Sequence, residues 1–203
     1  MPLNKDVLVP VTEPTEWVSQ MAVVHKPNGK LRICIDTQPL NAALKRGHYR
    51  LPVLDDVLPK LKDAKVFSKL DVKEAYWHVR LDEASSKLTT VITTFDRYMW
   101  KRLPFGLKVS SEIFQRKIDE ALGDLHGVFN MVDDVVIVGC GNSDAEAQSD
   151  NHQKLAVTLK GCAEKASLIS AIPIRSNAEV VSASPVASAA AAENPWIEPR
   201  QIV

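Results

Sequence analysis

The chain has 203 residues, 45 % of them hydrophobic and 25 % charged, and its formal net charge is zero. These values are ordinary for a soluble globular protein with one sizeable domain, or one domain and a tail. No apolar run approaches the roughly 20 residues that cross a bilayer. Residues 1–17 lack the basic patch and apolar core of a secretory signal. We therefore expect an intracellular protein, cytoplasmic or nuclear, that is neither secreted nor membrane-bound.

The cysteines and the distribution of charge indicate the compartment of the protein and the kinds of ligand that it could bind. Cys34, Cys140 and Cys162 lie far apart without a CxxC pair, which argues against a disulfide framework or a zinc site and favours a reducing compartment. Residues 1–118 hold 20 Lys/Arg against 13 Asp/Glu, a net charge of +7, and residues 119–203 hold 5 against 12, a net charge of −7. A basic part can attract phosphates and an acidic part can hold metal ions, although chance clustering of solvated charges accounts for the same numbers.

The elements predicted in chain order begin with a β-hairpin over residues 18–36, where two β-rich runs flank the turn Pro27-Asn28-Gly29. Short helical stretches are predicted over residues 40–44 and 55–61. Further strands are predicted over residues 66–72, 79–81, 88–95 and 98–103, the last pair being joined at Asp96-Arg97.

A helix is predicted from Ser110 or Ser111, a cap closely followed by Glu112, with its end at Gly123. Residues 127–141 contain two apolar, β-prone runs with Asp133-Asp134 between them, which indicates a second hairpin.

The last part of the chain changes in composition. A helix of moderate quality is predicted from Asp144 to about Lys165, and the Ala/Ser/Pro-rich residues after Ser167 predict a disordered tail. The predicted organisation is therefore an N-terminal extension over residues 1–12, a folded core over 13–166 and a tail over 167–203.

Three acids occupy positions that a metal site could use. Asp71 lies at the end of a predicted strand, and Asp133 and Asp134 occupy a predicted hairpin turn. If these strands are neighbours in one sheet, the three carboxylates converge at one edge. Mg²⁺ takes carboxylate and phosphate oxygens together, and two such ions can activate an attacking hydroxyl and stabilise a departing pyrophosphate. Aspartate is also a common turn residue, so the acids alone do not separate a metal site from an ordinary turn.

Several long blocks of sequence favour the metal site over an ordinary turn. They occur in one collinear order between about Glu13 and about Lys165, and such a set is more specific than a single short motif. They are EPTEWVSQMAVVHKPNGKLRICID, Leu40-Asn41, YRLPVLDDVLPKLKDAKVFSKLDVKEAYWHVRLD, RLPFGLKVSSEIFQRKID and the Asp-Asp hairpin. In these blocks the chain resembles the reverse-transcriptase domain of Gypsy-type long-terminal-repeat retrotransposons. The resemblance implies an α+β fold of fingers and palm, with an antiparallel palm sheet, helices packed on one face and no thumb.

The resemblance also implies a role for each matching position. The metal-binding catalytic residues are Asp71, Asp133 and Asp134, which would hold two Mg²⁺ ions, with Mn²⁺ as a substitute. The nucleotide-binding residues are Arg32, Lys26, Tyr76 and Phe105. The nucleic-acid contacts are Gly106, Gln115, Arg116 and Met131. The implied reaction transfers a deoxynucleoside triphosphate onto a primer 3′-hydroxyl, with an RNA or DNA template–primer duplex as the partner.

Each of these residues also has an ordinary structural interpretation. Tyr76 suits a core tyrosine, exposed basic residues are common beside an Asn-Gly hairpin, and LPFG suits a structural turn. The chain departs from the family pattern at Met131, which stands at a usually aromatic position, and at Asp96, which stands at a usual glycine and predicts mild strain. After Lys165 the expected lysine-bearing strand, primer-gripping hairpin and thumb do not follow.

Two alternatives to an active polymerase remain open. The first is a catalytically inactive relic, or a co-opted fragment that binds nucleic acid. The second, an unrelated α/β phosphotransferase, has little support because the chain contains neither a GxxxxGK[ST] loop nor a GxGxxG turn. The oligomeric state does not follow from the sequence.

Overall fold

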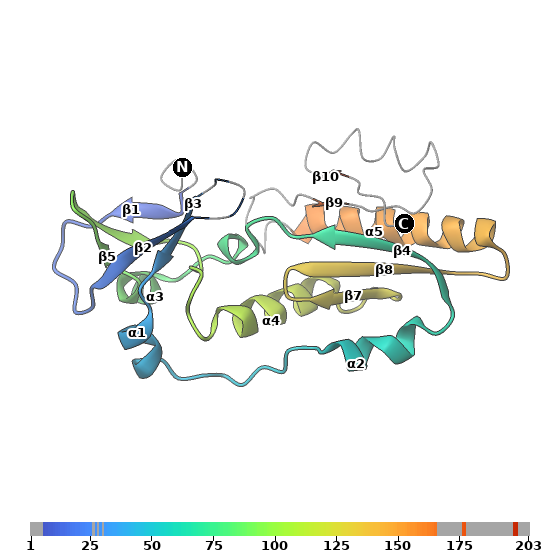
Figure 1. Cartoon of the computed structure of the whole chain (residues 1–203), viewed down its shortest axis with the longest axis horizontal. Helices are drawn as coiled ribbons and strands as arrows, with labels where there is room; N and C mark the ends of the chain where they lie inside the picture. The colour runs from blue at the N-terminus through green and yellow to red at the C-terminus, as the bar shows by residue number, and fades with distance from the viewer. Residues whose placement is uncertain are drawn as a thin grey trace. The chain divides into compact units, whose positions relative to one another are not determined.

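The computed structural model describes residues 6–25, 27, 29, 31–165, 176–177 and 197–198. The chain divides into two compact units, each built from two chain segments (Figure 1). Unit 1 comprises residues 1–48 and 76–113, and unit 2 comprises residues 49–75 and 114–203. The predicted tail after residue 166 lies outside the described residues, except for the short parallel pair β9 (Ser176–Asn177) and β10 (Ile197–Glu198).

Unit 1 contains a five-stranded sheet in the order β1-β6-β5-β2-β3. Its strands are β1 (Leu8–Pro10), β2 (Ser19–His25), β3 (Leu31–Ile35), β5 (Val91–Ile92) and β6 (Arg97–Trp100). Its helices are α1 (Gln38–Ala43) and α3 (Glu83–Leu88), and a 3₁₀ helix spans Ala75–His78. The antiparallel pair β2–β3 confirms the predicted hairpin, with Met21 opposite Ile35 and His25 opposite Leu31.

Three strand predictions in unit 1 were wrong in extent. A helix, α3, ends at Leu88, where a strand was expected, because the hydroxyls of Thr89 and Thr90 donate to the carbonyls of Ser86 and Lys87 at distances of 2.8 and 2.7 Å. Such back-bonding ends the helix and leaves only Val91–Ile92 to pair. Residues 79–81 form a single bridge between Arg80 and Arg102, the strand predicted over residues 98–103 shortens to β6, and β1 was not predicted.

The turn between β5 and β6 also differs from expectation. Asp96 does not belong to the described non-glycine residues with positive φ. The Thr93 hydroxyl accepts from the backbone N–H of Asp96 at 3.0 Å and donates to its carbonyl at 2.8 Å. The threonine side chain therefore shapes this turn, and the strain expected at Asp96 is absent.

Unit 2 contains a three-stranded antiparallel sheet in the order β4-β8-β7. Its strands are β4 (Ala64–Asp71), β7 (Val128–Met131) and β8 (Asp134–Cys140), and its helical segments are α2 (Leu54–Val57), a 3₁₀ helix (Leu58–Leu61), α5 (Asp144–Lys165) and the part of α4 (Ser110–Leu122) from Phe114 onward. The predicted strand over 66–72, the hairpin over 127–141 and both long helices are confirmed. A register shift lies between Ala64 and Val66, at the end of β4 far from Asp71.

Helix α5 packs along β4 and β8 (Figure 1). Its buried residues Ala147, Asn151, Leu155 and Thr158 recur at helical spacing and form the face toward the sheet. The contact is close because a Cβ on Gly139 of β8 would lie 2.1 Å from the Ala147 carbonyl oxygen. The predicted α+β class is thus confirmed, with a helix on one face of an antiparallel sheet.

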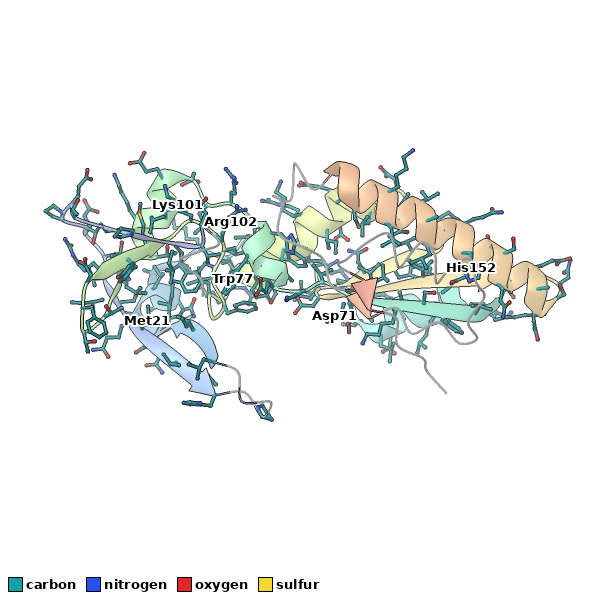
Figure 2. The ribbon with its side chains drawn as sticks, turned by 90° about the horizontal axis from the view of Figure 1, so that it is seen from above. Met21, Asp71, Trp77, Lys101, Arg102 and His152 are labelled. Atoms are coloured by element: carbon teal, nitrogen blue, oxygen red, sulfur yellow. The ribbon has the colours of Figure 1, made fainter. Side chains whose placement is uncertain are left out.

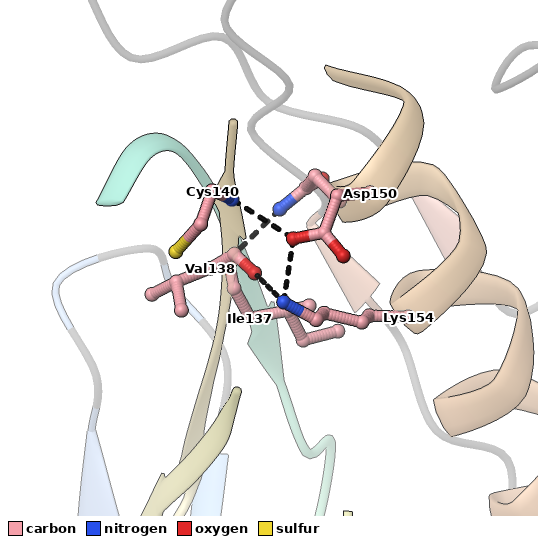
Figure 3. A network of polar contacts seen from close by, with 6 residues as sticks. Ile137, Val138, Cys140, Asp150 and Lys154 are labelled. Carbon is pink, nitrogen blue, oxygen red and sulfur yellow. Dashed lines mark hydrogen bonds and ion pairs between the residues drawn. The ribbon is translucent and has the colours of Figure 1, made fainter. Parts of the chain in front are cut away.

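Polar side chains of α5 bond directly to the strands (Figure 3). The Lys154 ammonium donates to the Val138 carbonyl at 3.1 Å and to Asp150 Oδ2 at 2.5 Å, and that same Oδ2 accepts from the Cys140 N–H at 2.8 Å. Deeper in the contact, Asn151 Nδ2 donates to the Ile137 carbonyl at 3.0 Å. These bonds satisfy polar groups that the close packing removes from water.

None of the helices in the described part of the chain combines the length and apolar character that a membrane crossing requires.

Candidate active site

The sheet of unit 2 brings the three acids to one end. Asp71 is the last residue of β4, Asp134 is the first residue of β8, and the antiparallel register makes them direct partners (Asp71 is labelled in Figure 2). Asp133 precedes β8 in the turn from β7, and its carbonyl accepts from the Val72 N–H at 2.8 Å. Because directly opposed residues of antiparallel strands share a face, Asp71 and Asp134 lie on the same face of the sheet.

A lysine is paired with one of the acids at this end of the sheet. The Lys69 ammonium lies 3.0 Å from Asp134 Oδ2, and both side chains are partly exposed. Lys69 precedes Asp71 by two residues and so lies on the same face of β4. In the part of the chain that the structure describes, no three His, Cys, Asp or Glu side chains are grouped so that they could hold a metal ion. The acids are therefore adjacent in register, with Asp134 engaged by a lysine.

The backbone immediately before Asp133 is strained. Val132 has a φ of 54°, and a β-branched residue in this left-handed region is a genuine outlier that costs about 1–3 kcal/mol. Its N–H donates to Oε1 of Gln115 at 2.7 Å. Gln115 lies on α4 and is fully buried, so it has no exposed surface with which to contact a template strand. Gln115 follows Phe114 and lies three residues before Ile118, so it lies at the edge of the apolar stripe of the helix. This position could have predicted from the sequence that its side chain is buried.

Two of the predicted nucleotide-binding residues lie together in unit 1. The rings of Tyr76 and Phe105 have centroids 4.8 Å apart, and the Tyr76 hydroxyl shares a hydrogen bond of 2.7 Å with Ser111 Oγ. Trp77, which Figure 2 labels, lies 6.1 Å from Phe105 and 6.1 Å from Trp100. The four aromatic side chains form one cluster, in which Tyr76 and Phe105 are only half-buried.

The turn that contains Gly106 is held by residues outside the LPFG motif. Gly106 has a φ of 101°, a conformation that glycine adopts without side-chain strain. Its carbonyl accepts from Thr37 Oγ1 and from Asn41 Nδ2, each at 2.9 Å, and Asn41 Oδ1 accepts from the Lys108 N–H at 2.8 Å. Sequence reasoning placed Asn41 in a matching block but gave neither Thr37 nor Asn41 a role at the site.

The remaining predicted residues are placed less fully. Arg32 lies in β3 opposite Val24, and its side chain is outside the described residues, as is the whole of Lys26. Arg116 is exposed on α4, with its Nε 3.9 Å from Glu120 Oε1. Met131 is half-buried at the end of β7, directly opposite Asp134.

A helix-backed antiparallel sheet with acids at the end of one strand and in the adjoining hairpin is the palm fold of a polymerase. Comparison with known proteins gives the same class and makes it specific. Residues 24–171 match the family described as "Reverse transcriptase (RNA-dependent DNA polymerase)", and the chain belongs to that family.

Relatives with curated sequences come from transposons and viruses. The chain is 35 % identical over 148 residues to the retrovirus-related Pol polyprotein from transposon 412 of Drosophila melanogaster, covering 68 % of this chain and 12 % of that protein. It is 31 % identical over 146 residues to the enzymatic polyprotein of cauliflower mosaic virus (strain Strasbourg), covering 72 % of this chain and 21 % of that one. An uncharacterized protein of Caenorhabditis elegans is 37 % identical over 134 residues, covering 64 % of this chain and 10 % of that protein. The chain thus spans about a tenth to a fifth of the length of these relatives.

Solved structures share the fold. The foamy viral protease-reverse transcriptase dRH in complex with double-stranded DNA matches with a TM-score of 0.66 at 21 % identity, covering 78 % of this chain and 27 % of that one. The same enzyme in complex with an RNA/DNA hybrid matches with a TM-score of 0.65 at 20 % identity, covering 79 % of this chain and 21 % of that one.

Proposed function

We propose that this chain is the fingers and palm of an RNA-directed DNA polymerase of a Gypsy-type retroelement. Its reaction is the transfer of a deoxynucleoside triphosphate onto a primer 3′-hydroxyl annealed to an RNA or DNA template. The observation that carries the proposal is the register of β4 and β8, which sets Asp71 opposite Asp134 and next to the Asp133 turn, in a chain of the reverse-transcriptase family.

The proposed metal ligands are Asp71, Asp133 and Asp134, and the proposed ions are two Mg²⁺, with Mn²⁺ as a substitute. Carboxylate oxygens are the hard ligands that Mg²⁺ takes. The Lys69 ammonium lies 3.0 Å from Asp134 Oδ2, so a metal ion bound by Asp134 would have to displace it. When bound, such ions lower the barrier to an in-line displacement at phosphorus by stabilising the attacking and leaving oxygens.

The proposed nucleotide-binding residues are in unit 1. Tyr76 and Phe105 offer ring faces for the sugar and base, and the Gly106 turn beside Phe105 is fixed by Thr37 and Asn41. Arg32 and Lys26 are proposed to bind the triphosphate through charge-assisted hydrogen bonds.

The proposed partner is a template–primer duplex, bound mainly through its phosphates. Unit 1 suits this partner because it has 12 Lys/Arg against 8 Asp/Glu, a net charge of +4. Gly106, Arg116 and Met131 remain proposed nucleic-acid contacts. Gln115 does not, because its side chain is fully buried. As an enzyme that consumes deoxynucleotides, the protein is proposed to act inside the cell.

The test is primer extension by the purified 203-residue chain, with deoxynucleotides, an RNA template and either Mg²⁺ or Mn²⁺. We expect extension by the wild type and none by Asp133→Asn. Asp124→Asn is the matched control because Asp124 is an exposed aspartate in the loop before β7. Extension that persists at the wild-type rate in Asp133→Asn would remove this residue from the chemistry.

A second candidate function is nucleic-acid binding without catalysis. It is favoured by one observation: Asp134 is paired with Lys69, and no cluster of three metal ligands forms among the described residues. Filter binding of an RNA/DNA duplex at low and moderate salt separates the two. Binding with a steep salt dependence, together with no extension in either metal, would favour the fragment that only binds.

A further inference from the structure

A hydrogen-bonded network beneath the β7–β8 turn connects α4 to the backbone beside Asp133. Gln115 Oε1 accepts from the Val132 N–H at 2.7 Å, and Gln115 Nε2 donates to Asp119 Oδ1 at 3.0 Å and to the Asn130 carbonyl at 3.3 Å. Asn130 Nδ2 donates to the same Asp119 oxygen at 2.6 Å. One buried amide is therefore shared among a strand, a turn and a helix.

The orientation of the Gln115 amide is determined by its partners. The Val132 N–H can only donate, so the atom that faces it must be the oxygen. The Asp119 carboxylate, when ionised, and the Asn130 carbonyl can only accept, so the atom that faces them must be the nitrogen. A flipped amide would place its nitrogen against the Val132 donor and its oxygen against the two acceptors, Asp119 Oδ1 and the Asn130 carbonyl. The network thus specifies a single geometry for the side chain.

A further hydrogen bond, from Tyr49, fixes the position of the Asp119 carboxylate. The Tyr49 hydroxyl donates to Asp119 Oδ2 at 2.7 Å. This bond, with some burial, raises the pKa of the Tyr49 hydroxyl, so the proton stays on tyrosine throughout the neutral range. Each oxygen of Asp119 therefore has donors, from Tyr49 on one side and from Gln115 and Asn130 on the other.

The turn needs this support because Val132 has a φ of 54°. A β-branched residue leaves the left-handed region unless its surroundings hold it there. The next residue is Asp133, whose carbonyl accepts from the Val72 N–H directly after Asp71. A change of backbone conformation at Val132 would therefore move Asp133 relative to Asp71.

We propose that Gln115 is a positioning residue for catalysis: its buried amide holds Val132 in the left-handed conformation that sets Asp133 beside Asp71, with Asp119 and Tyr49 fixing the amide. The proposal rests on the proposed polymerase function for its consequence in catalysis. The conformational part concerns the turn alone and stands without it.

The first test measures the turn and needs no activity. Gln115→Met keeps the length of the side chain and removes both its acceptor and its donors. We expect hydrogen exchange at the Val132 amide to become about tenfold faster or more, while amides in the middle of β8 change little. Lys117→Met on the same helix is the control and should leave the Val132 amide as protected as in the wild type. An unchanged Val132 amide in Gln115→Met would overturn the proposal.

The second test separates positioning from a general loss of folded protein. In primer extension we expect Gln115→Met to lower kcat by about 10²-fold, with little change in the KM for the deoxynucleotide, because the acid is misplaced while the nucleotide site is intact. Loss of folded enzyme would lower the amount of active protein but would leave the Mg²⁺ dependence unchanged. A misplaced Asp133 should raise the Mg²⁺ concentration at half-maximal rate.

A double-substitution cycle with Val132→Gly provides the decisive comparison. Glycine adopts positive φ without side-chain strain, so the turn in Val132→Gly has less need of the amide. We expect Gln115→Met to reduce kcat less in the Val132→Gly background than in the wild type. An equal or larger loss in that background would contradict the positioning role. If the wild type itself fails to extend a primer, the polymerase function fails, and the exchange measurement still decides whether Gln115 holds the turn.

Discussion

The two units differ in how they treat polar groups that are removed from water. In unit 2 the buried amide of Asn151 donates to one strand and accepts from Ser68 of another at 2.7 Å, and the amide of Gln115 is fully bonded. Among the described residues, the enclosed Nε2 of His152 in unit 2 has no hydrogen-bond partner, but unit 1 has more atoms of this kind. Those of unit 1 include Thr15 Oγ1, Ser19 Oγ, Ser86 Oγ, Trp100 Nε1, and Nε and Nη1 of Arg102. Leaving such a group unpaired costs about 1–3 kcal/mol, so we expect unit 1 to be the less stable unit.

Arg102, labelled in Figure 2, shows the difference most clearly. It is 5 % exposed and lies opposite Arg80 in an antiparallel bridge. Burial and the charge of Arg80 lower the pKa of its guanidinium, against the opposing effect of Asp6. Like charges directly opposite each other on strands are destabilising. Unit 2 also sets two like charges opposite each other, Asp71 and Asp134, but there Asp134 is paired with Lys69 and both of these side chains are partly exposed.

The two units differ in net charge but not in the presence of exposed apolar side chains. Unit 1 exposes Val23, Val24, Leu31 and Phe95, and unit 2 exposes Val53, Leu54, Leu58 and Val157. Unit 2 has 13 Lys/Arg against 17 Asp/Glu, a net charge of −4, where unit 1 has +4. The acids are therefore on the unit with a net negative charge, and the proposed nucleotide-binding residues are on the unit with a net positive charge.

Gly139→Ala tests the close packing of unit 2 and has the largest expected effect. The new Cβ would lie 2.1 Å from the Ala147 carbonyl, so α5 must move away from β8, at a cost of about 3 kcal/mol or more. Native-state hydrogen exchange of the β8 amides measures the loss. Gly161→Ala on α5 is the control, since a Cβ there would meet no atom within 4 Å outside its own helical turn, and it should stabilise unit 2 by up to about 1 kcal/mol.

Asn151→Ala tests the polar satisfaction of unit 2. It leaves the Ser68 hydroxyl and the Ile137 carbonyl without their partner, which should reduce the free energy of unfolding by about 2–3 kcal/mol. Urea unfolding followed at β8 amides gives the value. Gln153→Ala, two positions along the exposed face, should change stability by less than about 0.5 kcal/mol. A small effect of Asn151→Ala would weaken the contrast between the units.

Arg102→Met tests unit 1 and should have the opposite sign. Replacing a buried, unpaired guanidinium by an apolar side chain of similar length should stabilise unit 1 by about 1 kcal/mol. Exchange of the β2 and β3 amides reports on this unit. Lys101→Met, at the neighbouring and more exposed position, should change stability by less than about 0.5 kcal/mol. A clear loss of stability in Arg102→Met would show that its charge is compensated after all.

Asp150→Asn carries the smallest expected effect and a pH signature. Burial raises the pKa of the Asp150 carboxyl, but the Lys154 ammonium and the Cys140 N–H lower it by more, so the folded protein holds it below the ordinary value of 3.8. The carboxylate therefore contributes stability that is complete above that ordinary value and is lost as the pH falls through the lowered one. At neutral pH the variant should lose about 0.5–1 kcal/mol.

The difference between wild type and Asp150→Asn should shrink as the pH is lowered below 3.8. Thermal unfolding from neutral to acidic pH measures it. Asp63→Asn, at an exposed position, is the control substitution. A gap that stays constant through the acidic range would assign the effect to packing rather than to charge.

Local signals predicted most of the elements that carry the site. The Asn-Gly turn predicted the β2–β3 hairpin, and apolar runs on either side of Asp133-Asp134 predicted β7 and β8. The strand expected at residues 88–95 was wrong because alternating Thr and apolar residues look like a strand, while the hydroxyls of Thr89 and Thr90 bond back to α3.

The supporting contacts could not be predicted because they join distant positions. Thr37 and Asn41 reach Gly106 across 69 and 65 residues, and Tyr49 reaches Asp119 across 70. No periodicity or turn preference connects such pairs. Gln115 has the same limitation, since its role depends on a φ angle at Val132 that no sequence pattern specified.

The register shift at Lys65 has a consequence for how this palm can change in length. From Val66 to Asp71 the pairing with β8 is continuous, and the shift lies only at the far end, between Ala64 and Val66. Loss of one residue there would remove the bulge and keep every partner near the acids. Loss of one residue within 66–70 would turn the following side chains to the opposite face. Insertions and deletions among functional relatives should therefore collect at the bulge end of β4 and be absent from the stretch that leads to Asp71.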